Sequence, residues 1–292
     1  MLVTEEIPAF GVLIVLFAFS FILNGTFIIV ICKNWTLVKR RRVTYHVTSI
    51  AISDSLVGAS GFCKYIAIVA TGKNPNSLSK VFSEIGWMAA LTSLLAVCLM
   101  AIERLLCIKK PLTWNEILSL KRILRIMVGN WALALSLTIL VYFYPWKMRI
   151  FFGVLCYILI FVTALVYINM YIRISKSSKV DETQQSSSIG ERLNKLMQRK
   201  VGNLVLILAL VLVITMKPIL IFDSVKAACK LSNCKFLETM NTLVAYSYLL
   251  VAMNFVVNPI LYAWRIRLYR QAFWKMLGRA NNENNENKVL RI

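Results

Sequence analysis

Seven long apolar stretches alternate with short polar segments along the chain. Each stretch has about 20 to 28 residues, and a helix that rises 1.5 Å per residue needs about 20 to cross the hydrocarbon core of a bilayer. The pattern therefore predicts an all-α protein whose seven transmembrane helices form one bundle. We place the spans at residues 8–32, 44–71, 81–108, 123–143, 150–174, 201–225 and 240–264.

Six of the seven spans also contain polar residues that a lipid-facing helix is expected to exclude. Ionisable side chains are costly inside a bilayer, so they usually face the interior of a bundle and serve a function. We therefore expect the bundle to do more than anchor the chain. The polar or helix-breaking positions are Asn24, Asp54, Glu103, Arg104, Asn130, Lys217, Pro218, Asn254, Asn258 and Pro259.

The region after the last span has a pattern of its own. Leu268 and Phe273 are spaced among basic residues between Arg265 and Leu277, which predicts a short amphipathic helix on the membrane surface. Apolar residues make up 59% of the chain and the mean hydropathy is +0.68, which leaves little sequence for anything besides spans and short connections. We expect one domain over residues 1–278 and a short cytoplasmic tail over residues 279–292.

The Lys and Arg residues are divided unequally between the two sides of the predicted bundle. Segments 33–43, 109–125, 173–200 and 265–292 hold 24 of them, and the connections on the other side hold seven. Cytoplasmic loops carry the positive excess, so we expect the N-terminus outside and the C-terminus inside. The net charge of +21 then reflects topology and attraction to anionic membrane lipid, and nucleic-acid binding is not expected.

Two connections carry candidate chemistry. Cys229 and Cys234 lie five residues apart in an outer connection, where an oxidising compartment favours a local disulfide; the alternative is two free thiols. The cytoplasmic loop 175–200 is polar, and it is either a solvated linker or a site of phosphorylation. Its hydroxyl side chains are Ser175, Ser177, Ser178, Thr183, Ser186, Ser187 and Ser188.

Several of the polar residues form motifs in a fixed order along the spans. The third span ends in Glu103-Arg104, and the seventh ends in Asn258-Pro259-Ile260-Leu261-Tyr262. Together with single residues on four other spans, these motifs resemble the rhodopsin-like (class A) family of G-protein-coupled receptors, over residues 8 to about 278. The single residues are Asn24, Asp54, Trp131 and Pro218.

The resemblance implies a plasma-membrane receptor that binds an extracellular ligand and activates a heterotrimeric G protein by an outward shift of the sixth helix. Arg104 can pair with Glu103 at rest and with carbonyl groups of an inserting partner when active. The prolines kink their helices and create hinges. Receptor kinases and arrestin-like proteins are the further partners that the resemblance implies. The coupling residues are then Glu103, Arg104, Asn258, Pro259, Tyr262, Tyr167 and Pro218.

Four polar residues from three spans are expected to converge near mid-membrane. One carboxylate with hydroxyl and amide oxygens suits a small hard cation. In the family that the chain resembles, these positions hold a sodium ion that favours the inactive state. The alternative is a set of hydrogen bonds that joins the helices. The residues are Asp54, Ser93, Asn254 and Asn258.

Departures from the family pattern bear on the ligand. Ser79 stands where many members have a cysteine, the connection Tyr144–Arg149 is very short, and the fifth span lacks a proline. These features resemble the melanocortin receptors and the adenosine, cannabinoid and lysophospholipid receptors. We expect either a peptide or a small lipid or nucleoside, with Lys64 and Lys217 as alternative sites for an acidic headgroup. The candidate ligand residues are Glu84, Trp87, Phe222, Asp223, Tyr246 and Tyr248.

Other polytopic classes fit the sequence less well. A transporter usually shows internal repeats and broken helices, and a channel needs a pore-lining ring or a re-entrant filter; neither pattern is visible in the sequence. The sequence has one histidine, His46, and no cluster of His, Asp and Glu typical of a metalloenzyme. A transporter or channel therefore remains the alternative, and an enzyme is not expected.

Overall fold

The computed structural model describes residues 7–38, 42–72, 77–109, 113–143, 145–181, 207, 210–222, 224–226, 237–265 and 267–276. Six long helices dominate the described part: α1 (Ile7–Lys33), α3 (Arg42–Thr71), α4 (Ser77–Lys109), α6 (Leu120–Phe143), α7 (Pro145–Asp181) and α9 (Leu237–Arg265). Three short helices accompany them: α2 (Trp35–Val38), α5 (Trp114–Ile117) and α10 (Arg267–Met276). Residues 210–222 are also helical.

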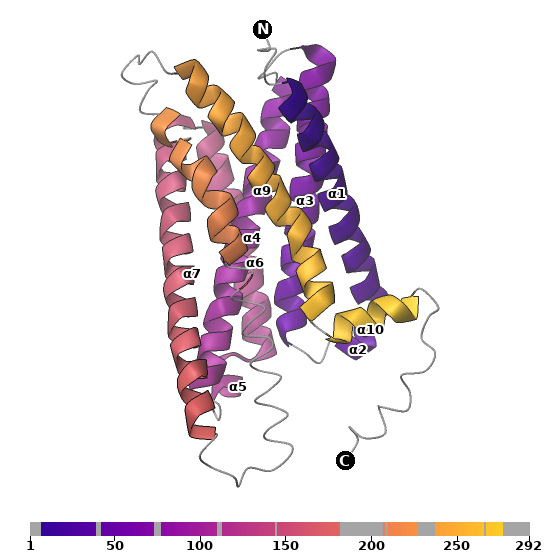
Figure 1. Cartoon of the computed structure of the whole chain (residues 1–292), viewed down its shortest axis with the longest axis vertical. Coiled ribbons are helices and arrows are strands. Elements are labelled where there is room, and N and C mark those ends of the chain that lie inside the picture. The colour runs from indigo at the N-terminus through magenta and orange to yellow at the C-terminus, as the bar shows by residue number, and fades with distance from the viewer. Residues whose placement is uncertain are drawn as a thin grey trace.

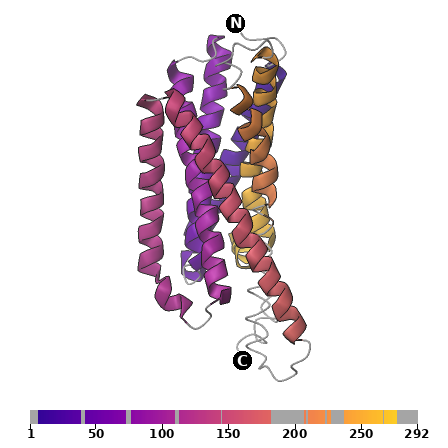
Figure 2. The same cartoon turned by 90° about the vertical axis from the view of Figure 1, so that its left-hand side faces the viewer.

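The long helices run side by side in one bundle (Figures 1 and 2). α3 packs against both α1 and α4, α1 also contacts α9, and α4 also contacts α6 and α7. α10 turns across the end of the bundle beneath α1, where α2 also lies (Figure 1). This confirms the predicted architecture of an all-α transmembrane bundle with a short helix after the last span.

Within the described residues, six helices are long and apolar enough to cross a membrane. They correspond to the predicted spans one to five and seven, and the helical residues 210–222 lie within the sixth predicted span. Large apolar side chains point outward along the bundle, among them Val128, Phe161 and Ile214, which are 70%, 64% and 66% exposed. This exposure suits a lipid environment and would be unfavourable in water.

The helix that contains the fifth span is longer than the predicted span, 150–174, at both ends, and the apolar part Gly153–Met170 lies within the predicted limits. α7 begins at Pro145, so most of the expected outer connection Tyr144–Arg149 belongs to the helix. Proline is favourable at the first helical position, because the N–H that it lacks has no partner there in any case. α7 then continues to Asp181, into the expected loop, because a helix outside the bilayer does not need to be apolar.

Two apolar cores are stacked along the bundle. The core nearer the start of α1 includes Phe17, Val57 and Phe255, and the core nearer α10 includes Phe27, Ala51 and Tyr262. On α1, α3 and α9, a buried polar residue lies between the two sets, and these residues are Asn24, Asp54 and Asn258. These three polar residues therefore form a polar layer between the two apolar cores.

A glycine allows the closest approach between two of these helices. A Cβ atom at Gly58 of α3 would lie 2.5 Å from the backbone nitrogen of Phe21 and 2.8 Å from the carbonyl oxygen of Phe17, both on α1. Both distances are shorter than van der Waals contact. Only glycine permits α1 and α3 to pack this closely, and their contact positions the Ser20 hydroxyl beside the carbonyl oxygen of Asp54.

Candidate functional site

The centre of the polar layer is the Asp54 carboxylate, which is fully buried. The Asn258 side-chain amide of α9 donates a 2.7 Å hydrogen bond to Asp54 Oδ2. Ser93 of α4 lies beside the same carboxylate and is 2% exposed. Three of the four predicted ion-binding residues therefore meet, from three helices, as the sequence led us to expect.

The polar layer also contains acceptor atoms that lack partners. Asp54 Oδ1 and Asn254 Oδ1 have no hydrogen-bond donor within the described part of the chain, although both residues are buried. Asn254 precedes Asn258 by about one helical turn on α9. Unpaired buried acceptors are uncommon, because each costs free energy unless a donor, water or cation satisfies it. The donor set of carboxylate, hydroxyl and amide oxygens suits a small hard cation.

Asn24 ties the polar layer to the backbone of a second helix. Its side-chain amide donates 2.9 Å hydrogen bonds to the carbonyl oxygens of Ser20, on α1, and Phe255, on α9. The Ser20 hydroxyl in turn donates to the carbonyl oxygen of Asp54 at 3.2 Å. These bonds lock α1, α3 and α9 together around the carboxylate.

A second charged group lies at the α10 end of the bundle. Glu103 is 1% exposed, and its Oε1 lies 3.4 Å from Nη2 of Arg104, whose side chain is 14% exposed. The predicted Glu103–Arg104 pair therefore exists, but it is a long contact. Oε2 of Glu103 lies only 2.8 Å from Nε2 of His46 on α3, which is 3% exposed.

Sequence reasoning missed His46 as a member of this group. A signal was available, because His46 precedes Asp54 by eight residues, or about two helical turns, and so lies at the same end of the bundle as Glu103. A lone histidine in a span carries no motif, however, and the contact depends on how α3 and α4 pack.

Two further predicted coupling residues, Tyr167 and Tyr262, lie in the core next to α10. Tyr167 of α7 and Tyr262 of α9 are 4% and 0% exposed, and neither hydroxyl has a hydrogen-bond partner among the described residues. Pro259 lies inside α9, and Pro218 lies within helical residues 210–222. The prolines are therefore placed where they can bend two helices that flank the cavity described next.

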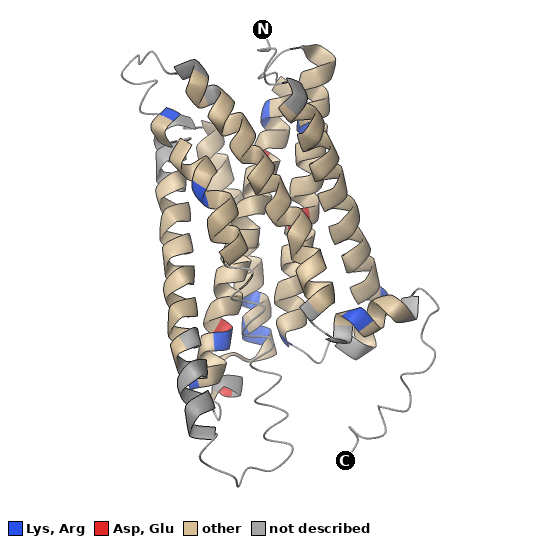
Figure 3. Cartoon of the chain, in the orientation of Figure 1, with Lys and Arg blue, Asp and Glu red and all other residues tan. Residues whose placement is uncertain are grey.

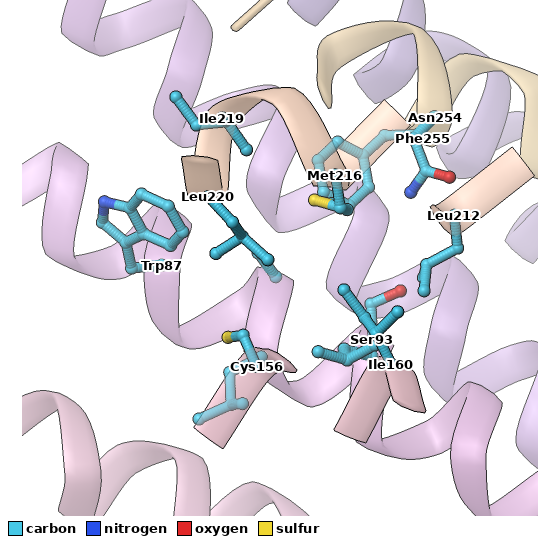
Figure 4. Close-up of a pocket in the computed structure, with 13 residues that line it drawn as sticks. Trp87, Ser93, Cys156, Ile160, Leu212, Met216, Ile219, Leu220, Asn254 and Phe255 are labelled. Carbon is cyan, nitrogen blue, oxygen red and sulfur yellow. The ribbon is translucent and has the colours of Figure 1, made fainter. Parts of the chain in front are cut away.

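An apolar cavity lies between α4, α7, α9 and residues 210–222 (Figure 4). The cavity is small, with a volume of about 30 Å³, which is room for a few atoms rather than for a whole ligand. Its walls are almost entirely apolar, and Ser93 and Asn254 are its polar lining residues. The cavity therefore borders the polar layer. The lining residues labelled in Figure 4 are Trp87, Ser93, Cys156, Ile160, Leu212, Met216, Ile219, Leu220, Asn254 and Phe255.

Of the predicted ligand residues, only Trp87 lines this cavity within the described part of the chain. The Tyr248 ring lies 6.5 Å from the Trp87 ring, and Nζ of Lys64 lies 4.9 Å from the centre of the Tyr248 ring. Glu84 and Phe222 are partly buried away from the cavity lining. Asp223, Cys229 and Cys234 lie outside the described residues.

The Tyr246 side chain is 45% exposed and does not line this cavity, and its role in ligand binding stays a prediction. Lys217 was expected in the bundle interior but is exposed, so that expectation is wrong. A long lysine side chain can run along an apolar surface toward polar headgroups.

The described charges are distributed unevenly along the bundle. Lys and Arg gather at the end where α5 and α10 lie, and the middle of the bundle carries few charges (Figure 3). Arg42 is near Glu103 and contributes to its electrostatic surroundings, together with His46 and Arg104. The buried Glu103 therefore faces a strongly positive end of the molecule.

Comparison with known proteins adds one match. Residues 23–150 match the family model described as 7 transmembrane receptor (rhodopsin family). The matched stretch covers the last part of α1, all of α3, α4 and α6, and the start of α7, and it contains Asn24, Asp54 and the Glu103-Arg104 pair. No curated protein matches the chain.

Proposed function

We propose that the chain is a rhodopsin-like receptor of the plasma membrane that binds an extracellular ligand and activates a heterotrimeric G protein. The carrying observation is the joined polar layer around Asp54, in a helix bundle whose Glu103-Arg104 pair lies at the basic end. The match over residues 23–150 supports a receptor rather than a transporter, a channel or an enzyme.

Arg104 is the proposed coupling residue. It adjoins the buried Glu103 and is itself partly exposed, so its guanidinium group is accessible from the α10 end. An outward shift of residues 210–222, hinged at Pro218, would admit a G-protein segment whose backbone carbonyls accept hydrogen bonds from the planar guanidinium. Tyr167 and Tyr262 supply hydroxyls that are free to bond in the shifted arrangement.

The polar layer is the proposed sodium site. Asp54 supplies the charge, and Ser93, Asn254 and Asn258 supply neutral oxygens, with two unpaired buried acceptors as the supporting observation. A cation that binds one conformation more tightly shifts the population toward it. The competing interpretation is that the same residues only join the helices.

The apolar lining of this small cavity favours an apolar ligand group with a single polar atom over a charged peptide side chain, and a larger ligand requires the lining side chains to move. The lining carries no charged side chain among the described residues, and Asn254 presents an unpaired acceptor at its border. A hydrogen-bond donor on the ligand would satisfy that acceptor. This observation favours the lipid alternative within the range of expected ligands.

The proposal of an apolar ligand is tested by a substitution that fills the cavity with a larger side chain. Ala90 lines the cavity, so A90F is expected to abolish the response to any lipid that activates the wild type. A132F, on the exposed side of α6, is the matched control and should respond normally. Activation of the wild type by a basic peptide, undiminished in A90F, would refute the apolar-ligand proposal.

Receptor kinases and arrestin-like proteins are proposed as regulatory partners through the segment Ser175–Ser188, which comprises the end of α7 and the residues that follow it. Each phosphate would add about −1.5 to −2 charges to this segment, whose two Lys are balanced by Asp181 and Glu182, and so create an acidic surface. Replacing its seven hydroxyl residues with alanine should abolish arrestin recruitment. Unchanged recruitment would leave the loop as a spacer.

A further inference from the structure

Glu103 has two oxygens and two nitrogen partners from different helices. Oε2 lies 2.8 Å from His46 Nε2 on α3, and Oε1 lies 3.4 Å from Arg104 Nη2 on α4. The first distance is typical of a charge-assisted contact, and the second is beyond that range. His46 and Glu103 are almost completely buried, whereas Arg104 is partly exposed. The shorter and better shielded contact is therefore the one to His46.

The two contacts compete because they draw on one carboxylate. The His46 contact is shorter and better shielded from water than the Arg104 contact, and an imidazole N–H can donate to a carboxylate without a net charge on the ring. We therefore take the His46 contact as the firmer of the two. Arg104 is then held loosely by a carboxylate that is already engaged. The other titratable groups near this carboxylate are Arg42 at the start of α3 and Cys107 on α4, and Tyr269 of α10 lies near Arg104.

We propose that His46 is a positioning residue that competes with Arg104 for Glu103 and thereby sets the resting activity of the receptor. This inference rests on the proposed G-protein coupling. Without His46, the buried Glu103 carboxylate is left with Arg104 as its nearest cation, so it holds Arg104 more tightly. Loss of His46 therefore lowers basal signalling. A simple restraint between α3 and α4 would give the opposite result when removed.

The first experiment measures basal GTP exchange per surface receptor for each class of heterotrimeric G protein. H46L is expected to lower the basal rate by about threefold to tenfold, a size typical of coupling between neighbouring charged groups. H46Q keeps an N–H that reaches toward Glu103, so it should recover most of the difference from H46L. T48V is the matched control, because the Thr48 hydroxyl bonds the Thr44 carbonyl of its own helix.

Epistasis separates competition from general stability. E103Q removes the shared charge and should raise basal activity, and H46L/E103Q should behave like E103Q because there is no longer anything to compete for. A basal rate in H46L that is unchanged or raised at equal surface expression overturns the proposal. A double variant that falls well below E103Q also overturns it.

The second experiment detects the contact between His46 and Glu103 by NMR, without a G protein. The sequence contains one histidine, so the imidazole NMR signals of the purified receptor in lipid nanodiscs belong to His46 alone. E103Q and R104A should both shift these signals, the first by removing the partner and the second by releasing Oε1, and T48V should not. If no G protein responds to the wild type, the proposed function fails, and unshifted signals in R104A separately overturn the competition.

Discussion

Asp54 is fully buried, and its described side-chain hydrogen-bond donor is the Asn258 amide. A buried carboxylate that is not matched by a cation or by enough donors is costly. The Ser93 hydroxyl beside Asp54 can donate to the carboxylate, but Asn254 Oδ1 has no partner among the described residues. A cation beside Asp54 would satisfy such an oxygen and offset the charge, which is the reason for proposing a cation site here rather than only a joint between helices.

The sodium proposal predicts a stability change that needs no ligand. Raising sodium to about ten times its dissociation constant should stabilise the purified receptor by about 1 kcal/mol, because the ion binds only the folded chain. D54N should remove this gain. Thermal unfolding in sodium chloride and in the choline salt at equal ionic strength measures it.

S53A is the control for this prediction. Ser53 adjoins Asp54, but its hydroxyl bonds the carbonyl oxygens of Ser49 and Ile50 on its own helix. Its sodium response should match the wild type. A wild type that is insensitive to sodium would reduce the polar layer to a joint between helices.

Arg104 and Glu103 should give opposite phenotypes. R104A removes the proposed contact with the G protein and should reduce receptor-dependent GTP exchange by at least about tenfold, since a bidentate guanidinium contact has no substitute in alanine. E103Q frees Arg104 and should raise the basal rate. Both are measured at matched surface expression, and normal exchange in R104A would exclude the coupling role.

The residues of the polar layer were predictable, and their partners were only partly so. Asp54 and Asn258 in this layer, like Glu103 at the α10 end, could be predicted because a polar residue inside an apolar span is costly unless it faces the bundle interior. His46 was missed because it lies near the end of a span, where a polar residue is common. The sequence could not place Tyr246, because an aromatic residue is equally suited to lipid and to a cavity wall.

At the scale of helices, the close α1–α3 contact depends on Gly58 having no side chain. G58A would place a methyl group against the backbone of α1, and backbone cannot move aside as the end of a flexible side chain can. We expect a loss of about 1 to 3 kcal/mol in unfolding free energy, as in other overpacked interiors. Unfolding in detergent, followed by helix content or by loss of the monomer peak, measures it.

Gly129 provides the matched control for this contact. It lies within α6, and a Cβ atom there would have no other atom within 4 Å. G129A should leave stability unchanged or raise it by up to about 1 kcal/mol, because alanine favours a helix more than glycine does. Equal effects of G58A and G129A would mean that α1 and α3 do not need their close approach.

The positions of the helices were largely predictable from the hydropathy of the sequence. A run of apolar residues long enough to span a bilayer leaves few alternatives to a helix, because every backbone polar group must be satisfied internally. The residues at which the helices begin and end were less predictable. Ser77–Val81 and Pro145–Arg149 are helical although the apolar pattern starts later, since the helix is free to continue in the polar interface.

At the scale of the whole molecule, orientation follows from charge. Lys and Arg crowd the end that carries α5 and α10 (Figure 3). Arg104 lies near the end of α4 (Ser77–Lys109), which leads to α5. During insertion, positively charged segments are retained on the cytoplasmic side. The coupling residue and the basic loops should therefore both face the cytosol, which is the only side where a G protein can reach Arg104.

Epitope tags test this orientation directly. A tag before Met1 should be stained on intact cells, and a tag after Ile292 should be stained only after permeabilisation. A tag in the connection 182–200, on the same predicted side as the C-terminus, should behave like the C-terminal tag and so controls for a terminus that fails to cross. Staining of the C-terminal tag on intact cells would reverse the orientation, and Arg104 would then face away from any cytosolic partner.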